Sequence, residues 1–414
     1  LSAHYAIGFP GRELASAREL RLSPLHDRLK SMGAVFGDRA GWERPSWFQS
    51  RSAPVSTALQ FGKPHWFDCV AREHRAAREA VAVFDQSSFG KILVQGRDAA
   101  AFLERNCAGR VDVAPGQVTY TPILNTRGGY ESDVVCLRLE EDVFLVVTGS
   151  AQQTRDMDLL RGRIGMHEFV TLTDMTSAYA VIGIMGPEAR TVMTRLGKAD
   201  FSNEAFPYLA HREVEIGDTV ARAARISYVG ELGWELYVAT EAALPLYDRI
   251  RDAGSDLGLE NAGSFAMAGL RLEKGYCAWG HDIGPDDTPI HAGLGFLTKL
   301  AGNVDFVGRS ALETHKSSGV TRRRISLTVD DPEVVLMGLE PIVMSGEIAG
   351  YTTSAAYGHT VGRSVATGYI RVDERPLKDI VAAAVFEVEV GLRRHDATAS
   401  LRAVHDPHGE RLRS

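Results

Sequence analysis

The sequence lacks a long apolar run and closely spaced cysteines. No stretch of about 18 apolar residues occurs, so no transmembrane helix is expected. The cysteines form no C-x-x-C pair, which argues against zinc ribbons and thioredoxin-like redox motifs. They are Cys69, Cys107, Cys136 and Cys277. Few, scattered thiols suit a reducing compartment, and we expect each to be buried. The chain begins without an initiator Met or a signal-peptide pattern, as a piece of a longer or a processed polypeptide does.

A nucleotide-binding loop is also missing. Gly293–Gly295 carries two glycines of a G-x-G-x-x-G loop, but Thr298 stands in the place of the third, and no Walker A motif occurs. We therefore predict that the chain has no dinucleotide site and performs no flavin or nicotinamide chemistry unaided. The formal net charge of −7 gives no basis for binding nucleic acid through its phosphates.

Recognisable metal and nucleophile constellations are absent as well. His281 stands next to Asp282, but sequence neighbours rarely share a metal ion and no third ligand is spaced for zinc. No Ser–His–Asp or Cys–His arrangement can be justified. We predict no metal site, no membrane contact and no nucleic-acid partner.

The composition is that of an ordinary globular protein, with 44% hydrophobic and 24% charged residues. Its 414 residues exceed the roughly 250–300 at which a single core stops growing, so two or three domains are expected. Residues 1–52 have too little apolar periodicity for a domain and are predicted to be a strap on a larger body. Within them, Ser23 and Pro24 are predicted to be the N-cap and first residue of a helix.

Residues 85–255 contain an internal repeat. Gly96 and Gly186 each follow a strand pattern and open a helix, and they lie 90 residues apart. Phe144 and Trp234 each begin a strand that leads to a second helix, at the same offset. Coincidence is the alternative explanation for two matched segments.

Each copy also has room for a hairpin, over residues 134–144 in the first and 212–226 in the second. Strand, helix, two strands and helix make a split β-α-β unit. We predict an α+β fold with two tandem ferredoxin-like units.

The pattern of apolar and polar residues changes after about residue 320. Residues 324–329, 386–390 and 400–404 alternate apolar and polar side chains, which predicts short strands in a small barrel or jelly-roll module. We place the main domain at residues 53–320 and the β module at 321–414.

Two motifs carry candidate chemistry. Asp133 follows a glycine-marked turn, and a carboxylate there suits a cleft mouth that binds a heterocycle nitrogen or moves a proton. The alternative is an Asp satisfied by nearby backbone amides. On an extended chain Glu231, Gly233 and Glu235 share one face. Glu235 lies in an apolar strand and needs a partner, either an Arg or the N–H edge of a pterin-like ligand.

Several pieces, taken together, resemble the aminomethyltransferase (T-protein) of the glycine cleavage system. They are Gly116–Tyr120, Leu124–Asp133, Tyr228–Glu235, Leu270–Glu273 and Ala366–Ile370. The similarity runs from about residue 75 to the C-terminus. It implies an aminomethyltransferase-like fold of three lobes and a tetrahydrofolate site.

The lead-in narrows the resemblance to the sarcosine and dimethylglycine dehydrogenase family. His4–Ala6, Arg21–Arg28, Gly33–Phe48 and Phe84–Phe89 are similar to the segment that joins the flavin half to the folate half. In that family the N-terminal half holds FAD and oxidises an N-methyl amine to an iminium. The C-terminal half holds tetrahydrofolate and captures the one-carbon unit as 5,10-methylenetetrahydrofolate. The resemblance implies tetrahydrofolate here, and FAD only through a partner domain or subunit on which residues 1–52 would pack.

The resemblance also implies residue roles. Asp133 corresponds to the catalytic carboxylate near N5 and N10 of folate, Tyr120 to an aromatic lining residue, and Glu235 to the acid at the pterin edge. Tyr228 and Glu231 belong to the same cofactor-binding motif. T-proteins have an arginine four residues before Arg271, where this chain has Met267.

Two rival functions are compatible with these residues. One is a stand-alone tetrahydrofolate-dependent demethylase or methyltransferase, which would act without flavin. The other is a non-catalytic structural lobe, which the departure at Met267 favours and the presence of Tyr120, Asp133 and Glu235 disfavours. The expected location is the bacterial cytoplasm or the mitochondrial matrix, with a small N-methyl amine as substrate.

Overall fold

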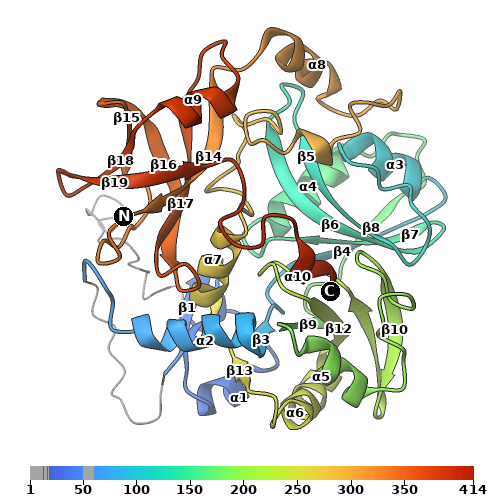
Figure 1. The fold of residues 1–414 in the computed structure, drawn as a ribbon. Coiled ribbons are helices and arrows are strands. Elements are labelled where there is room, and N and C mark those ends of the chain that lie inside the picture. Colours follow the sequence, from blue (N-terminus) through green and yellow to red (C-terminus); the bar gives the residue numbers. More distant parts are fainter. Residues whose placement is uncertain (1–12, 14–15, 17, 50–59) are drawn as a thin grey trace.

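The structure, a computed structural model, describes residues 13, 16, 18–49 and 60–414 (Figure 1). The strap residues 1–12 and 50–52 lie outside the described residues, and with them the motif His4–Ala6. Figure 1 shows three lobes: a cyan unit, a green unit and an orange-red β lobe.

Two copies of one unit build the cyan and green lobes. The first consists of β4 (Gly90–Gln95), α3 (Ala99–Asn106), β5 (Val118–Leu124), β6 (Tyr130–Glu140), β7 (Val143–Thr148), α4 (Gln153–Gly162) and β8 (Thr171–Asp174). The second consists of β9 (Tyr179–Met185), α5 (Ala189–Leu196), β10 (His211–Ile216), β11 (Thr219–Ala224), β12 (Gly233–Ala239), α6 (Ala243–Ala253) and β13 (Leu259–Asn261). The sheet orders are β5-β6-β7-β4-β8 and β10-β11-β12-β9-β3-β13, with β3 (Val81–Asp85) inserted in the second. The predicted α+β fold with two tandem units is confirmed.

The paired glycines explain why the repeat was visible in the sequence. Gly96 and Gly186 have φ angles of +131° and +140°, which only glycine adopts without strain. A Cβ at Gly96 would lie 2.1 Å from the carbonyl oxygen of Phe169, and one at Gly186 would lie 2.5 Å from that of Ala80. Each glycine therefore turns the chain from a strand into a helix under a neighbouring backbone.

The predicted hairpins are not equivalent to each other. Residues 134–144 form β6 and β7, whereas residues 212–226 form β10 and β11, the counterparts of β5 and β6. Each unit has three antiparallel strands between its helices, one more than predicted. The missed strand, β5, contains Pro122, which breaks a strand pattern but is tolerated because β5 lies at the edge of its sheet.

The two sheets pack against each other through their inner faces. Helices α3 and α4 cover the outer face of the first sheet, and α5 and α6 cover that of the second. The inner faces meet in an apolar layer that includes Val118 and Leu137 from one sheet and Val181 and Tyr237 from the other. Because strand side chains alternate, Asp133 points to the same inner face as Leu137, and Glu235 to the same face as Tyr237.

The described lead-in packs on the helices that link the lobes. It contains α1 (His26–Ser31) and the antiparallel pair β1 (Ala34–Arg39) and β2 (Trp42–Phe48). Strand β2 contacts α2 (Phe67–Glu79) and α7 (Ser264–Glu273). The predicted helix start at Pro24 is wrong, because Ser23 forms a turn in which its Oγ accepts from the Leu25 N–H, and α1 begins at His26.

The third lobe is a closed barrel in the order β14-β17-β16-β15-β18-β19. Its strands are β14 (Arg322–Val329), β15 (Pro341–Met344), β16 (Glu347–Gly358), β17 (Arg363–Arg371), β18 (Phe386–Val390) and β19 (Arg393–Ser400). The remaining helices are α8 (Arg309–Ser318), α9 (Leu377–Ala383) and α10 (Glu410–Arg413). The predicted strand at 400–404 is wrong: β19 ends at Ser400, and the chain leaves the barrel towards α7, where the His405 N–H donates to the Glu273 carbonyl. Over the described residues, no helix is long and apolar enough to span a bilayer.

Candidate functional site

Tyr120 and Asp133 meet on neighbouring strands β5 and β6. The Tyr120 hydroxyl donates to Asp133 Oδ2 over 2.8 Å. Burial raises the pKa of Asp133 to about 6, and the Tyr120 hydrogen bond opposes that rise because it stabilises the ionised carboxylate. Burial and the nearby Asp133 raise the pKa of Tyr120, which therefore stays protonated and remains a donor. Asp133 on β6 is therefore hydrogen-bonded by a side chain of the neighbouring strand β5.

These two residues are desolvated without being sealed from water. Tyr120, Asp133 and Tyr228 each keep part of their surface accessible to water. Even so, desolvation by the surrounding protein is the main cause of the pKa shift of each one. The place that these three partly buried side chains share is called the recess below.

Glu235 lies deeper, between the two sheets. Its Oε1 accepts from Gln86 Nε2 over 3.0 Å, and its Oε2 accepts from the Tyr237 hydroxyl over 2.7 Å. Burial raises the pKa of Glu235. None of the ion pairs among the described residues involves Glu235, so the predicted alternative of a Glu–Arg pair is wrong. The carboxylate keeps lone pairs for a further N–H donor.

Tyr228 connects the recess to the centre of the molecule. Its hydroxyl donates to the Cys277 carbonyl over 2.7 Å, and its ring stacks on Tyr276 at 6.0 Å between centroids. Cys277 packs in one apolar cluster with Tyr130, which lies three residues before Asp133 on β6. The charge of Asp133 also contributes to the raised pKa of Tyr228. The structure thus brings Tyr120, Asp133 and Tyr228 to one place.

Glu231 has a different environment. Strand β12 begins at Gly233, so the prediction that Glu231 shares an extended face with Glu235 is wrong. Glu231 is buried and its carboxylate accepts from Arg78, His405 and Arg411 at 2.9, 3.0 and 2.7 Å. A cofactor contact at Glu231 would have to replace one of these partners, and its role as a binding residue stays a prediction.

Arg271, like Glu231, already has a charged partner within the protein. Arg271 pairs with the buried Asp282 at 2.5 Å, whereas His281 is exposed. In the part of the chain that the structure describes, no group of three His, Cys, Asp or Glu side chains is placed to hold a metal ion. Met267 lies in an apolar cluster with Trp47 and Phe84 and offers no charge to a ligand.

Sequence reasoning missed three side chains next to the site. Gln86 Oε1 and the Tyr130 hydroxyl are buried and have no hydrogen-bond partner among the described residues. Tyr237 holds Glu235 from two positions along β12. The alternation around Glu235 could have indicated Tyr237, and Gln86 stands within the lead-in motif Phe84–Phe89. Tyr130 stands within the motif Leu124–Asp133, but its neighbour Cys277 is distant in sequence.

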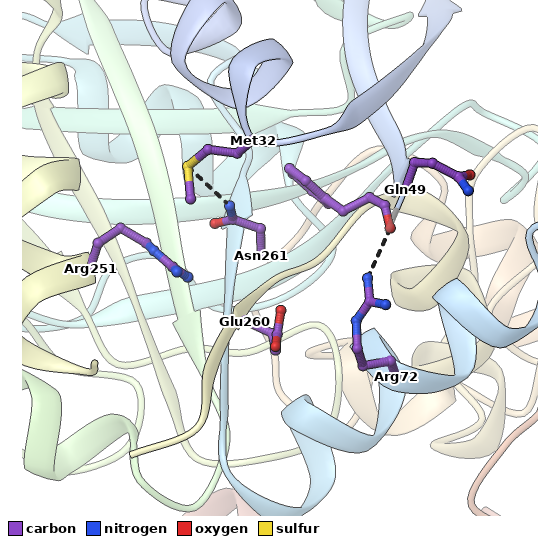
Figure 2. A pocket seen from close by; sticks show the side chains of 7 residues that line it. Met32, Gln49, Arg72, Arg251, Glu260 and Asn261 are labelled. Atoms are coloured by element: carbon purple, nitrogen blue, oxygen red, sulfur yellow. Dashed lines mark hydrogen bonds between the residues drawn. The ribbon is translucent and has the colours of Figure 1, made fainter. Parts of the chain in front are cut away.

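Two described hollows lie away from these residues. Figure 2 shows one of about 300 Å³, lined by Met32, Phe48, Gln49, Arg72, Arg251, Glu260 and Asn261. Its arginines already donate within the protein, Arg72 to the Phe48 carbonyl at 2.9 Å and Arg251 to the Leu259 carbonyl at 3.0 Å. A second, of about 590 Å³, runs along the solvent side of α4. None of the predicted site residues lines either one.

Comparisons with known proteins identify the family of both parts of the chain. Residues 25–302 match the GCVT N-terminal domain, and residues 322–406 match the glycine cleavage T-protein C-terminal barrel domain. The chain is 39% identical over 99% of its length to the 4-methylaminobutanoate oxidase (formaldehyde-forming) of Paenarthrobacter nicotinovorans. It is 35% identical over the same share to mitochondrial sarcosine dehydrogenase of Mus musculus. It covers 49% of each of these two relatives, about half of their length.

A solved structure gives the same fold. The glycine cleavage system aminomethyltransferase T of Bartonella henselae superposes with a TM-score of 0.74, at 24% identity, over 92% of this chain and 98% of that one. The three-lobed architecture predicted from the sequence motifs is therefore that of an aminomethyltransferase.

Proposed function

Because the chain belongs to the glycine cleavage T-protein family, we propose that it binds tetrahydrofolate and serves as the one-carbon acceptor module of an N-methyl amine dehydrogenase. The methyl donor would be of the sarcosine or dimethylglycine type and the product 5,10-methylenetetrahydrofolate. The FAD would be held by a partner domain or subunit, and the setting would be the bacterial cytoplasm or the mitochondrial matrix. The observation that carries the proposal is the hydrogen-bonded pair of Tyr120 and Asp133 in the recess.

The residues present fit a reduced pterin. Its ring offers a donor edge of N–H groups, and Glu235 with the orphaned Gln86 Oε1 offers two adjacent acceptors at the inner end of the site. Because a buried acceptor without a partner costs about 1–3 kcal/mol, a ligand that donates to Gln86 would recover that energy. Tyr120 and Tyr228 add aromatic surface on the way to Asp133.

Asp133 is suited to hold or move a proton. With a pKa of about 6 the carboxyl is mainly ionised at pH 7 and exchanges protons near neutral pH, which is the range a general acid–base group needs. The Tyr120 hydroxyl fixes one carboxylate oxygen, and the Gln152 side chain also helps to stabilise the ionised form of Asp133. Tetrahydrofolate supplies the nitrogen nucleophiles that capture a one-carbon unit at the formaldehyde level. Confinement beside Asp133 raises the effective concentration of that unit.

Calorimetric titration with tetrahydrofolate tests the proposal. The unaltered chain should bind saturably, and the double variant Asp133→Ala, Glu235→Ala should lose binding. The matched control is Glu241→Ala, Asp252→Ala, which removes two exposed acids from the same unit. Failure of the unaltered chain to bind, or equal binding by all three proteins, would refute the proposal.

A further inference from the structure

Arg44 on strand β2 is partly buried and has no ionic partner among the described residues. Like Tyr120 and Asp133, its guanidinium keeps some accessible surface, and burial is the main cause of a fall in its pKa to about 10. No hydrogen bond or ion pair joins it to any described residue, and its one ring contact is with Phe89, whose centroid lies 5.9 Å from Cζ. A desolvated cation without an anion raises the free energy of the folded protein, so an anionic ligand that pairs with Arg44 would lower it.

The strand that carries Arg44 is fixed in place. Glu73 accepts from the Phe48 N–H at 2.5 Å and from the Gly263 N–H at 2.8 Å, and so ties the end of β2 to the start of α7. Trp47 stacks on Phe265 of α7, with 5.5 Å between centroids. These contacts fix the backbone of β2, the strand that carries Arg44.

The Phe89 ring that Arg44 contacts packs against the apolar layer between the two sheets. That layer contains Val118, which lies on the same strand as Tyr120, and Tyr237, whose hydroxyl donates to Glu235. Arg44 therefore lies at the edge of the layer whose strands carry the proposed folate residues.

The buried and half-buried arginines nearby are already engaged. Arg271 donates to Asp282 and to the Tyr276 carbonyl, and Arg324 donates to the Ala292 carbonyl. Arg44 differs from both because its guanidinium has no hydrogen bond or ion pair to a described residue, and it differs from the nearby Arg39 because Arg39 is exposed to solvent.

We infer that Arg44 binds the carboxylate of the ligand that occupies the recess, a step that rests on the proposed function. A guanidinium offers paired N–H donors that match a carboxylate, and the desolvated site strengthens that bond. Two ligands share this chemistry: the glutamyl tail of a folate and an N-methyl amino acid. The lead-in thereby takes part in the site as a specificity-determining element.

Titrations with three probes test the inference. Arg44→Gln, Arg44→Lys and the control Arg249→Gln, an exposed arginine of α6, are compared with the unaltered chain. The probes are tetrahydrofolate, a tetrahydropterin without the glutamyl tail, and sarcosine. Thermal midpoints confirm folding, and the charge-retaining Arg44→Lys carries the test if Arg44→Gln does not fold.

If the folate tail is the ligand, Arg44→Gln weakens tetrahydrofolate about 10- to 100-fold, with tetrahydropterin unchanged and a smaller loss in Arg44→Lys. If an amino acid is the ligand, sarcosine binding is lost and tetrahydrofolate is unchanged. Unchanged binding of both in Arg44→Gln, or in Arg44→Lys where that variant carries the test, overturns the inference and leaves the proposed function standing. Absence of pterin and folate binding by the unaltered chain overturns both.

Discussion

Asp133→Asn should stabilise the protein and slow one-carbon transfer. Burial moves the pKa of Asp133 from 3.8 to about 6, a rise of about two units. Since one unit corresponds to about 1.4 kcal/mol, keeping the ionised carboxylate in the recess costs the folded state about 3 kcal/mol at pH 8. A neutral amide of nearly the same shape avoids that cost.

The gain in stability should depend on pH. Below pH 3.8 the carboxyl is protonated in both the folded and unfolded chain, so it contributes no penalty. Between 3.8 and about 6 the unfolded chain releases its proton first, and the folded state loses stability as the pH rises. Above about 6 both are ionised and the penalty is constant. The advantage of Asp133→Asn should therefore be about 1.5 kcal/mol at pH 5 and about 3 kcal/mol at pH 8.

Urea denaturation at pH 5 and pH 8 measures this difference. Asp252→Asn, on an exposed position of α6, is the matched control and should show no such pH dependence. An equal gain at both pH values, or none, would refute the claim that the recess desolvates Asp133. Transfer to tetrahydrofolate should fall about 10²- to 10⁴-fold in Asp133→Asn if the carboxyl moves a proton. Full activity would remove that role while leaving the electrostatics intact.

Three further changes test the surroundings of the site. Tyr120→Phe removes the hydrogen bond that lowers the pKa of Asp133, so the acidic limb of the pH–rate profile should move to higher pH; an unmoved limb contradicts the coupling. Glu235→Gln replaces an acceptor with a donor and should weaken tetrahydrofolate and tail-free tetrahydropterin alike, about 10- to 100-fold by calorimetry. Equal affinity would rule out Glu235 as the pterin acid. Arg78→Met removes the buried cation that Glu231 and Glu273 share and leaves each acid with its other partners only, so it should cost up to about 3–5 kcal/mol in urea denaturation, whereas a loss below about 1 kcal/mol would show that the network is neutral.

Much of the fold was predictable because its signals are local. Gly96 and Gly186 indicate turns from a strand into a helix, because these turns require a positive φ. The apolar periodicity around the two glycines repeats at a fixed offset in the sequence. The alternating runs of the barrel were equally visible. The strand β5 was missed because Pro122 obscures its pattern, and only the sheet order reveals that it is an edge strand.

Some residues of the candidate site could likewise be predicted from the sequence, whereas some of their partners could not. Family motifs single out Tyr120 and Asp133, which are 13 residues apart on adjacent strands, so that a short hairpin register brings them together. Glu235 could be recognised as an acid in an apolar strand, but its partner Gln86 lies 149 residues away. That pair forms only because the two sheets pack face to face.

The sequence by itself determined the repeating units, the barrel and the identity of the central carboxylate, since each follows from periodicity, glycine placement or a contiguous motif. Tertiary structure alone decided which polar groups are satisfied. Glu231 looked as available as Glu235, yet Arg78, 153 residues away, and the C-terminal Arg411 close around it. Arg44 resembles an ordinary charged residue of a strand in the sequence, yet packing leaves it partly buried with no ionic partner in the part of the chain that the structure describes. Desolvation and pairing depend on groups brought together across the chain, which no local pattern encodes.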